Sequence, residues 1–308
     1  MNAKSGRREA ITGDTRPRPG ASKSAPAAAH ALAPALYVVA TPIGNLSDLS
    51  ARAIETLARV ALIACEDTRV SGVLLARHGI STPTAAYHDH NAERMRPKLL
   101  ARLRAGEAVA LISDAGTPLI SDPGYKLVRA CIEAGVAVVP VPGPSAVMAA
   151  LTAAGLPTDR FLFAGFLPPK SAARRAALAE LRDVKATLVM FEAANRCAEA
   201  LADMAVVLGD RPAALCRELT KLHEQVRRGP VSQLAQGAAD DPPRGEVVIV
   251  VAGAGDHAPA VDLDALLTDA LSAERLRDAV DAVAAATGRP RREVYARALE
   301  LKAARDGR

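Results

Sequence analysis

The sequence predicts an α/β protein of two domains, with a largely parallel sheet in the first domain and a small helical segment at the C-terminal end. Short apolar runs at residues 36–40, 60–65, 108–112 and 136–141 have the length and composition of buried strands. Each run ends in a polar or Gly/Pro-containing loop, and an Ala- and Leu-rich stretch suited to a helix follows it. This alternation favours parallel strands joined by helices, with the loops gathered at the carboxyl edge of the sheet, where small ligands bind in open α/β folds.

The loop after the third run is the strongest functional signal in the chain. Residues 113–124 read SDAGTPLISDPG, so the backbone must make two tight turns that contain acids and hydroxyls. Either turn alone is explained by the need to connect a strand to a helix. Both in tandem favour a ligand-binding loop, in which Gly116 allows a close approach between backbone and ligand.

The rest of the chain divides by composition and periodicity. Residues 1–33 are rich in Ala, Gly, Pro, Ser and Arg and show no periodicity, which is typical of a disordered basic arm and lacks the apolar stretch of a secretory signal. We place the first α/β domain, with its ligand-binding loops, at residues 34–157 and a second α/β domain at residues 158–254. In the second domain, strands are expected at 187–191, 213–216 and 246–251, and a helix at 196–208.

Residues 262–308 are expected to form a small helical hairpin. Ser272 is suited to cap a helix whose apolar face includes Val280, and Gly288 is suited to end it. Pro290 then suits the first turn of a second helix, which would carry a basic outer face.

Composition narrows the classes of function. The chain has 308 residues, of which 50% are hydrophobic and 24% charged, as in an ordinary soluble protein, and its apolar runs are too short to span a membrane. Only 3% of the residues are aromatic and none is Trp, which argues against RNA binding on an aromatic platform. The four cysteines are widely spaced, which favours reduced thiols in a cytoplasm over disulfides. His88 and His90 lack a third ligand nearby in sequence, so no metal site is expected.

Five short segments occur in a defined order along the chain. They are TPIGNL at 41–46, EDTR at 66–69, the loop at 113–124, PGPS at 142–145 and RELTK at 217–221. This ordered set resembles the ribosomal RNA small subunit methyltransferase I family of the tetrapyrrole methylase superfamily. The resemblance implies a two-domain tetrapyrrole-methylase-like fold and 2′-O-methylation of a cytidine ribose in the decoding region of 16S rRNA, within the small ribosomal subunit. It also implies S-adenosylmethionine as the cofactor and a homodimer as the assembly.

The implied chemistry is transfer of a methyl group from a sulfonium to a ribose hydroxyl. The protein has to align the reacting groups and help the hydroxyl to lose its proton, because a free 2′-hydroxyl is a poor nucleophile at neutral pH. By resemblance, the cofactor lies in the cleft between the two domains. The candidate cofactor-binding residues are Pro42, Gly44, Asn45, Asp114, Gly116, Thr117, Pro118, Gly143, Ser145, Ala146 and Phe191.

The candidate catalytic residues are acids and one lysine within or next to these segments. A carboxylate can accept the proton, and a cation can stabilise the developing alkoxide. For each acid, a structural role as a helix cap or ion-pair partner remains open. The candidates are Glu66, Asp67, Asp122, Glu192, Glu218 and Lys221.

Basic charge is concentrated at the two ends of the chain. The formal net charge is +5, but residues 1–30 hold six Lys or Arg against two acids and residues 288–308 hold seven against three. The ends therefore carry +8 and the residues between them −3. Contact with RNA phosphates and a merely solvated surface are both consistent with this distribution. The candidate RNA-binding residues are Arg69, Lys170, Arg196, Arg289, Arg291 and Arg292.

The sequence departs from the family pattern at one position, and two other functions remain open. The family has a His in the segment that reads FEAANR at 191–196 here, and Asn195 takes its place, so a catalytic role at this segment would pass to Glu192 or Arg196. A methylase of tetrapyrroles or other small acidic substrates would share the cofactor site. A ribosome-assembly factor with a vestigial pocket would share the basic ends but would not bind the cofactor.

Overall fold

The first domain is a three-layer sandwich of helices around a parallel sheet. The computed structural model describes residues 32–255, 263–273, 275–287 and 291–306. The sheet has the order β3-β2-β4-β1-β5, and all its pairs are parallel. Its strands are β1 (Leu36–Val39), β2 (Leu62–Cys65), β3 (Thr84–Ala86), β4 (Val109–Ile112) and β5 (Val138–Val141). The predicted parallel sheet is confirmed, and β3 is a strand that the periodicity did not predict.

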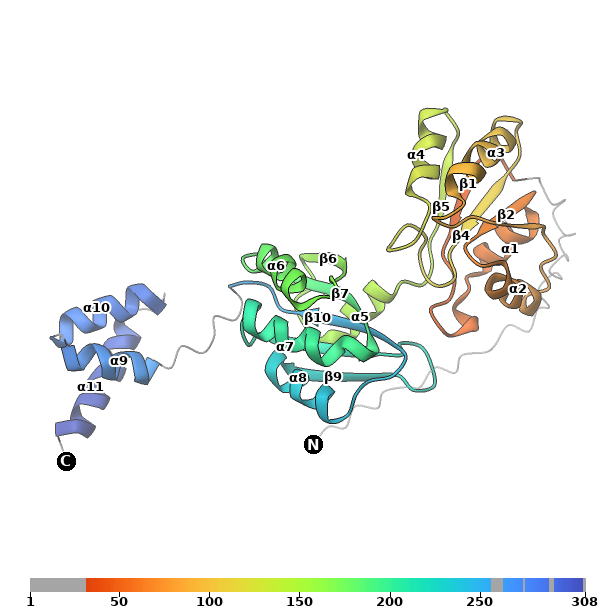
Figure 1. Ribbon diagram of the computed structural model, residues 1–308. Coiled ribbons are helices and arrows are strands. Elements are labelled where there is room, and N and C mark those ends of the chain that lie inside the picture. Colours follow the sequence, from red (N-terminus) through yellow and green to blue (C-terminus); the bar gives the residue numbers. More distant parts are fainter. Residues whose placement is uncertain (1–31, 256–262, 274, 288–290, 307–308) are drawn as a thin grey trace, which may run out of the picture.

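Four helices cover the two faces of this sheet (Figure 1). They are α1 (Ala51–Arg59), α2 (Thr68–Arg77), α3 (Ala92–Arg104) and α4 (Tyr125–Glu133). One apolar cluster joins α1 and α2 to one face, and a second joins α3 and α4 to the other. The Ser50 side chain caps α1 by accepting a hydrogen bond from the Ala53 amide, and Asp67 caps α2 by accepting one from Arg69.

The second domain contains a mixed sheet. The order is β6-β7-β10-β8-β9, in which only β6 and β7 pair in parallel. The strands are β6 (Phe161–Phe166), β7 (Thr187–Ala193), β8 (Pro212–Arg217), β9 (Gln225–Pro230) and β10 (Glu246–Val251). One face packs against α6 (Ser171–Leu181), α7 (Cys197–Leu208) and α8 (Val231–Asp240).

The other face of the second sheet packs against α5 (Ala146–Ala154), which directly follows β5 of the first domain. The apolar cluster at this contact joins Leu151 of α5 and Ile43 of the β1 loop to Val189 and Val250 of the second sheet. Helix α5 therefore holds the carboxyl edge of the first sheet against the open face of the second.

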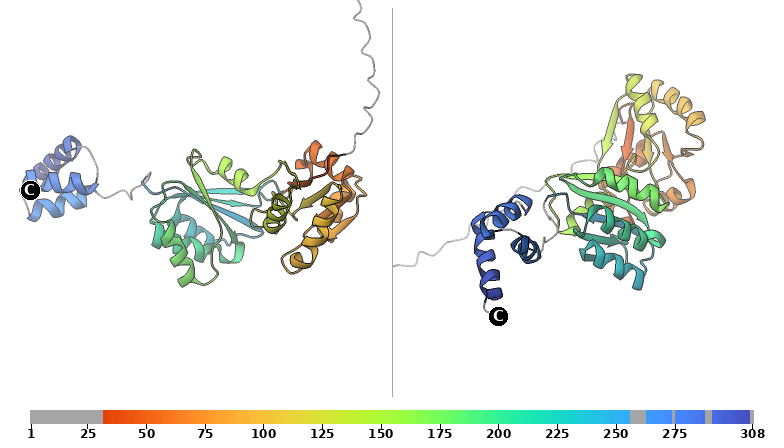
Figure 2. Two further views of the ribbon diagram at one scale, coloured as in Figure 1. Left: turned by 90° about the horizontal axis from the view of Figure 1, so that it is seen from above. Right: turned by 60° about the vertical axis from the view of Figure 1, so that its left-hand side comes forward.

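The C-terminal segment has three helices: the two predicted helices are present, and a third that was not predicted precedes them. They are α9 (Leu263–Ala273), α10 (Leu276–Thr287) and α11 (Arg291–Asp306), and they lie apart from both sheets in Figures 1 and 2. Ser272 lies in the last turn of α9, where its hydroxyl donates to the Asp269 carbonyl, instead of capping α10. Leu267 of α9 packs with Val280 of α10 and Val294 of α11 in one apolar core, so all three helices are needed to bury these side chains. Gly288, Arg289 and Pro290, and residues 1–31 of the basic arm predicted at 1–33, lie outside the described residues.

None of the described helices combines the length and the apolar character needed to cross a membrane. The cysteines Cys65, Cys131, Cys197 and Cys216 are buried free thiols, as the sequence predicts.

Candidate active site

A cavity of about 330 Å³ lies between the carboxyl edge of the first sheet and the face of the second. The first domain contributes Ile43, residues from the loop after β4, and the start of α5. The second contributes β7, the end of β6, and the start of β10. The lining residues are Ile43, Ala115, Gly116, Thr117, Ile120, Ser121, Asp122, Ser145, Ala146, Phe166, Phe191, Glu192, Ala193, Cys216, Leu219, Gly245, Glu246, Val247 and Val248.

The loop after β4 is tied to its neighbours at the floor of the cavity. The amide of Thr41 donates to the Gly116 carbonyl at 2.8 Å, and the amide of Gly116 donates back to Thr41 at 3.0 Å. Gly116 has φ of +83°, and a Cβ there would lie 3.3 Å from the Ile43 side chain. The Thr117 hydroxyl donates to the Pro144 carbonyl at 3.0 Å, so it joins two of the predicted cofactor loops.

The second turn of this loop brings Asp122 to the cavity. Leu119 and Ser121 adopt positive φ angles of 75° and 65°, which is unfavourable for residues with side chains and is concentrated at functional sites. Burial raises the pKa of Asp122 to about 6 against the opposing effect of a hydrogen bond with Ser113, and the negative charge of Glu66 raises it further. The Asp122 carboxyl is thus poised to exchange a proton near neutral pH.

The two acids at the end of β2 have different surroundings. Burial and the nearby Asp114 carboxylate raise the pKa of Glu66, but Glu66 does not line the cavity. Hydrogen bonds from Arg69 lower the pKa of Asp67 to about 2. Asp67 also caps α2 and forms an ion pair with Arg69 at 2.6 Å, while its amide donates to Asp114. Asp67 and Arg69 are therefore partners of one another, outside the cavity.

Glu218 and Lys221 lie behind the second-domain wall. The Lys221 ammonium donates to Glu218 at 3.0 Å and to Glu246 at 3.1 Å. Although burial alone would lower the pKa of Lys221, these hydrogen bonds raise it. A Cβ at Gly44 would overlap Lys221, and one at Gly245 would overlap Glu218. The two glycines are therefore needed so that the loops of the two domains can close around this ion-pair network.

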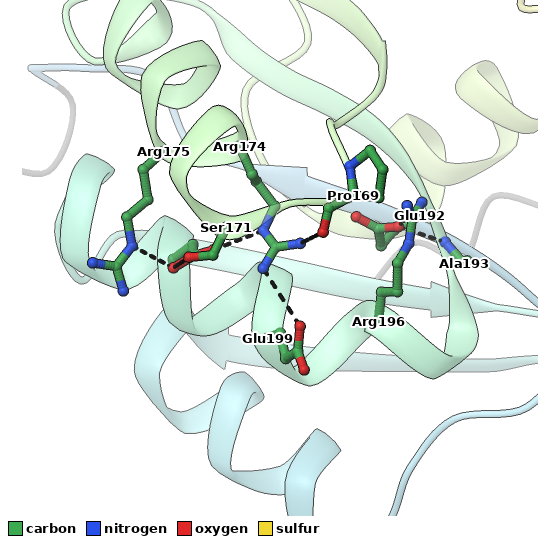
Figure 3. Close-up of polar contacts among 9 residues, drawn as sticks. Pro169, Ser171, Arg174, Arg175, Glu192, Ala193, Arg196 and Glu199 are labelled. Atoms are coloured by element: carbon green, nitrogen blue, oxygen red, sulfur yellow. Dashed lines mark hydrogen bonds and ion pairs between the residues drawn. The ribbon is translucent and has the colours of Figure 1, made fainter.

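Glu192 faces away from the cavity, although its backbone contributes to the wall. Leu188 and Met190 on β7 belong to the apolar cluster with α7, and strand alternation puts the Glu192 side chain on that same face. There it is buried and forms an ion pair with Arg196 at 2.6 Å (Figure 3). Arg196 is thus committed to Glu192.

The cavity brings together five of the eleven predicted cofactor residues: Gly116, Thr117, Ser145, Ala146 and Phe191. Pro42 and Asp114 instead line a separate surface hollow beside α2. Gly143 packs against Ala40, where a Cβ would lie 3.1 Å from the Ala40 Cβ. Gly44, Asn45 and Pro118 support the loops without lining the cavity. Ile120 and Phe166 also line the cavity but were not among the predicted site residues: Ile120 has no polar group to mark it within the loop at 113–124, and no spacing rule links Phe166 to that loop.

The described RNA-binding candidates differ in how their charge is compensated. Lys170 is exposed between β6 and α6, and Arg292 is exposed on α11. Arg291 forms an ion pair with Asp281 of α10, which reduces its free charge. Within the described part of the chain, no group of three potential ligands is placed to hold a metal ion, and His88 pairs with Asn91.

Two family matches cover most of the chain. Residues 35–235 match the tetrapyrrole (corrin/porphyrin) methylases, and residues 257–302 match the RsmI C-terminal HTH domain. A ribosomal RNA small subunit methyltransferase I from Mesorhizobium japonicum is 54% identical over 278 residues, covering 89% of this chain and 94% of that protein. The protein of the same name from Pseudomonas aeruginosa is 49% identical over 272 residues, covering 86% and 96%.

Solved structures share the fold at low sequence identity. A cobalt precorrin-4 methyltransferase has a TM-score of 0.54 at 18% identity and covers 71% of this chain and 95% of its own. Diphthine synthase has a TM-score of 0.53 at 15% identity, with coverages of 70% and 89%. A uroporphyrin-III C-methyltransferase from Thermus thermophilus, solved with S-adenosyl homocysteine, has a TM-score of 0.50 at 20% identity, with coverages of 71% and 97%.

Proposed function

Because this chain belongs to the ribosomal RNA small subunit methyltransferase I family of tetrapyrrole methylases, we propose that it methylates the ribose 2′-oxygen of a cytidine in 16S rRNA. It is an S-adenosylmethionine-dependent rRNA methyltransferase. The proposed target is cytidine 1402, in the decoding region. The high identity to rRNA methyltransferases favours an RNA substrate over a tetrapyrrole, since the tetrapyrrole enzymes named above are related at only 18–20% identity.

The cavity between the domains is the proposed cofactor site. The polar residues Thr117 and Ser145, together with the apolar wall at Phe191, suit a ligand with polar ends and an aromatic ring, and Gly116 leaves room for its close approach. When bound there, S-adenosylmethionine supplies an electrophilic methyl group. The hydrogen bond between Thr117 and Pro144 keeps two of the contact loops in place.

The observation that carries the proposal is the Asp122 carboxyl in this cavity. With a pKa of about 6, it is deprotonated at neutral pH and still basic enough to accept the proton of a ribose hydroxyl. The other acids are less suited to that role. Glu192 faces α7, Glu218 is held by Lys221, and Glu66 lies outside the cavity.

We propose that exposed basic side chains of the protein bind the RNA phosphates and hold the RNA at the site. Lys170 lies four residues after Phe166 of the cavity wall, and Arg292 belongs to the C-terminal helices. Both are exposed and suited to phosphates. The proposed setting is the cytoplasm, with the small ribosomal subunit as the partner.

The decisive experiment is methyl transfer from labelled S-adenosylmethionine to small subunits that lack the modification, followed by mapping of the product. Wild-type protein and Glu133→Gln, an exposed change on α4, are expected to label one cytidine ribose. Labelling of a base, or of no nucleotide, would contradict the proposal. Free 16S rRNA in a parallel reaction identifies which form is the substrate.

A homodimer is part of the proposal and comes from the family resemblance. Sedimentation at micromolar concentration is expected to give a species of twice 32.0 kDa. A single species at the monomer mass would contradict it.

A further inference from the structure

The phenylalanines of this chain are confined to one corner of the molecule. The chain has only four, and they all lie on the neighbouring strands β6 and β7: Phe161, Phe163, Phe166 and Phe191. Phe191 packs edge to face against Phe163 at 4.8 Å and against Phe166 at 5.5 Å between ring centroids. A composition that is poor in aromatic residues thus still produces an aromatic cluster, and two of its three members line the cavity.

A β-bulge directs Phe166 toward the cavity. Phe163 pairs with Val189, but Phe166 pairs with Phe191. The interval between the two pairs is three residues long on β6 and two on β7, so β6 holds one extra residue. Gly165 in this interval has φ of +66°. Bulges of this kind redirect side chains at sheet edges and next to active sites, and β6 is an edge strand.

Phe166 is also unusually accessible for its type. Its exposed fraction is 58%, although it belongs to the cavity wall. Phe191 supports the ring from the inner side. A solvated phenyl group at the mouth of a cavity has no role in packing the core, but it offers a flat apolar surface to an incoming planar group.

The bulge also places this ring beside the loop of Asp122. A Cβ on Gly165 would lie 3.8 Å from the Ser121 hydroxyl, so the chain neighbours of Phe166 and Asp122 lie close to one another across the two domains. In a nucleotide, the 2′-oxygen and the base are attached to adjacent ribose carbons. A ribose whose 2′-hydroxyl is at Asp122 must therefore bring its base close to the loop–bulge contact.

We propose that Phe166 is the stacking surface for the base of the nucleotide being methylated. The inference rests on the proposed function, because it takes the 2′-hydroxyl to be at Asp122. It adds a residue that selects a planar base turned out of the RNA strand, which single-stranded RNA readily supplies. The same chemistry, a planar nucleobase, is present in the adenine of the cofactor, so the test has to separate the two.

The test compares Phe166→Leu, Phe166→Tyr and Phe166→Trp with Phe161→Leu. Phe161 lies on the same strand and is 44% exposed, but it does not line the cavity, so it is a matched control. We measure kcat and KM for small subunits that lack the modification, the affinity for S-adenosylhomocysteine by calorimetry, and thermal unfolding. Base stacking on an aromatic side chain corresponds to a loss of roughly ten- to a hundredfold when the ring is removed.

The expected result is that Phe166→Leu lowers kcat/KM by about that factor at unchanged affinity for S-adenosylhomocysteine. Phe166→Tyr and Phe166→Trp should retain most of the activity, and Phe161→Leu should behave as wild type. An equal loss of S-adenosylhomocysteine affinity would assign the ring to adenine and overturn the inference, as would full activity of Phe166→Leu. If the wild-type protein does not methylate a ribose at all, the proposed function fails, and this outcome is distinct from an inactive Phe166 variant beside an active wild type.

Discussion

At the scale of single residues, Asp122 is a half-buried acid of the cavity wall whose pKa is raised, whereas the more deeply buried Glu192 is held in an ion pair with Arg196. The raised pKa means that the folded protein binds a proton more readily than the unfolded chain does. The Asp122 carboxylate therefore opposes folding as pH rises from about 4, the value for an unfolded Asp, through about 6. An acid that lowers the stability of the folded protein in this way and lies in a cavity is typical of a catalytic group.

We predict that kcat rises with pH through a single ionisation near 6 and then levels, since only the deprotonated Asp122 accepts a proton. Asp122→Asn should lower kcat by about a hundredfold or more, because an amide cannot take the proton. It should leave thermal stability at pH 7 unchanged or higher. Measured pH–rate profiles of both proteins test this, and an Asp122→Asn enzyme with the wild-type profile would exclude Asp122 as the base.

Gly116 and Gly135 provide a matched pair for the cofactor site. Both have positive φ, +83° and +69°, so a valine strains the backbone at either position. Gly135 has open space around it, whereas Gly116 lies against Ile43 in the cavity. Gly116→Val should abolish binding of S-adenosylhomocysteine in calorimetry, and Gly135→Val should not. Thr117→Ala should weaken binding by roughly 1 kcal/mol through loss of one hydrogen bond. If the folded Gly116→Val and Gly135→Val proteins bound S-adenosylhomocysteine with equal affinity, the cofactor site would have to lie outside this cavity.

At the scale of elements, α6 and α7 are joined by a buried cluster of charges (Figure 3). Arg174 of α6 is only 1% exposed and pairs with Asp203 of α7 at 2.7 Å, while a second guanidinium hydrogen bond, to the Pro169 carbonyl, holds the loop after β6. Burial alone would raise the pKa of Asp203, but hydrogen bonds from Arg175, Arg174 and Ser171 lower it. The cluster therefore stabilises the fold and also positions the segment that follows Phe166.

Asp203→Ala is expected to lower the free energy of unfolding by about 3 kcal/mol, because the buried Arg174 loses its nearest carboxylate and keeps only the longer ion pair with Glu199 at 3.7 Å and the hydrogen bond to Pro169. Since the folded-state pKa of Asp203 is lowered, the stabilisation is present above the unfolded pKa of about 4 and is lost as pH falls below it. Denaturant titrations at pH 7 and pH 3 measure both effects. Glu133→Ala, which breaks the exposed pair with Arg129, serves as the control and should cost less than about 0.5 kcal/mol.

At the scale of the whole molecule, the basic C-terminal helices are a separate unit with a core of their own. Part of their charge is compensated internally, since Arg291 pairs with Asp281 and Arg297 pairs with Asp264 and Glu300. Arg292 is exposed on the first turn of α11. The contribution of this unit to RNA binding should thus be smaller than its count of arginines suggests.

Removal of residues 261–308 should raise KM for small subunits and flatten its dependence on salt, because each lost phosphate contact removes counterion release. The kcat and the affinity for S-adenosylhomocysteine should not change, since the cavity lies in the other two domains. KM values across a salt series for full-length and shortened protein provide the measurement. Identical series would exclude the C-terminal helices as an RNA contact.

Local patterns were enough to predict the parallel sheet and the loops at its edge. Strand-sized apolar runs followed by Gly and Pro loops occur within a few residues, and their meaning does not depend on distant parts of the chain. The edge strands β3, β6 and β9 escaped prediction; β3 is too short for a strand-sized apolar run, β6 is interrupted by a glycine, and β9 is largely polar. β9 even contains Arg227 and Arg228. Helix α9 escaped because its role is to complete a core made by later helices.

Short motifs in a defined order were enough to identify the family, the cofactor and the loop that carries Asp122. Only the tertiary structure decided which motif residues meet in the cavity. It turned Glu192 toward α7 through strand alternation, and it used Lys221 to join loops of both domains. It also gathered the scarce phenylalanines on two neighbouring strands, so that Phe166 and Phe191 line the same cavity as Asp122. Composition counts side chains over the whole chain, whereas a cavity wall is built from the few side chains that packing and a single bulge bring together.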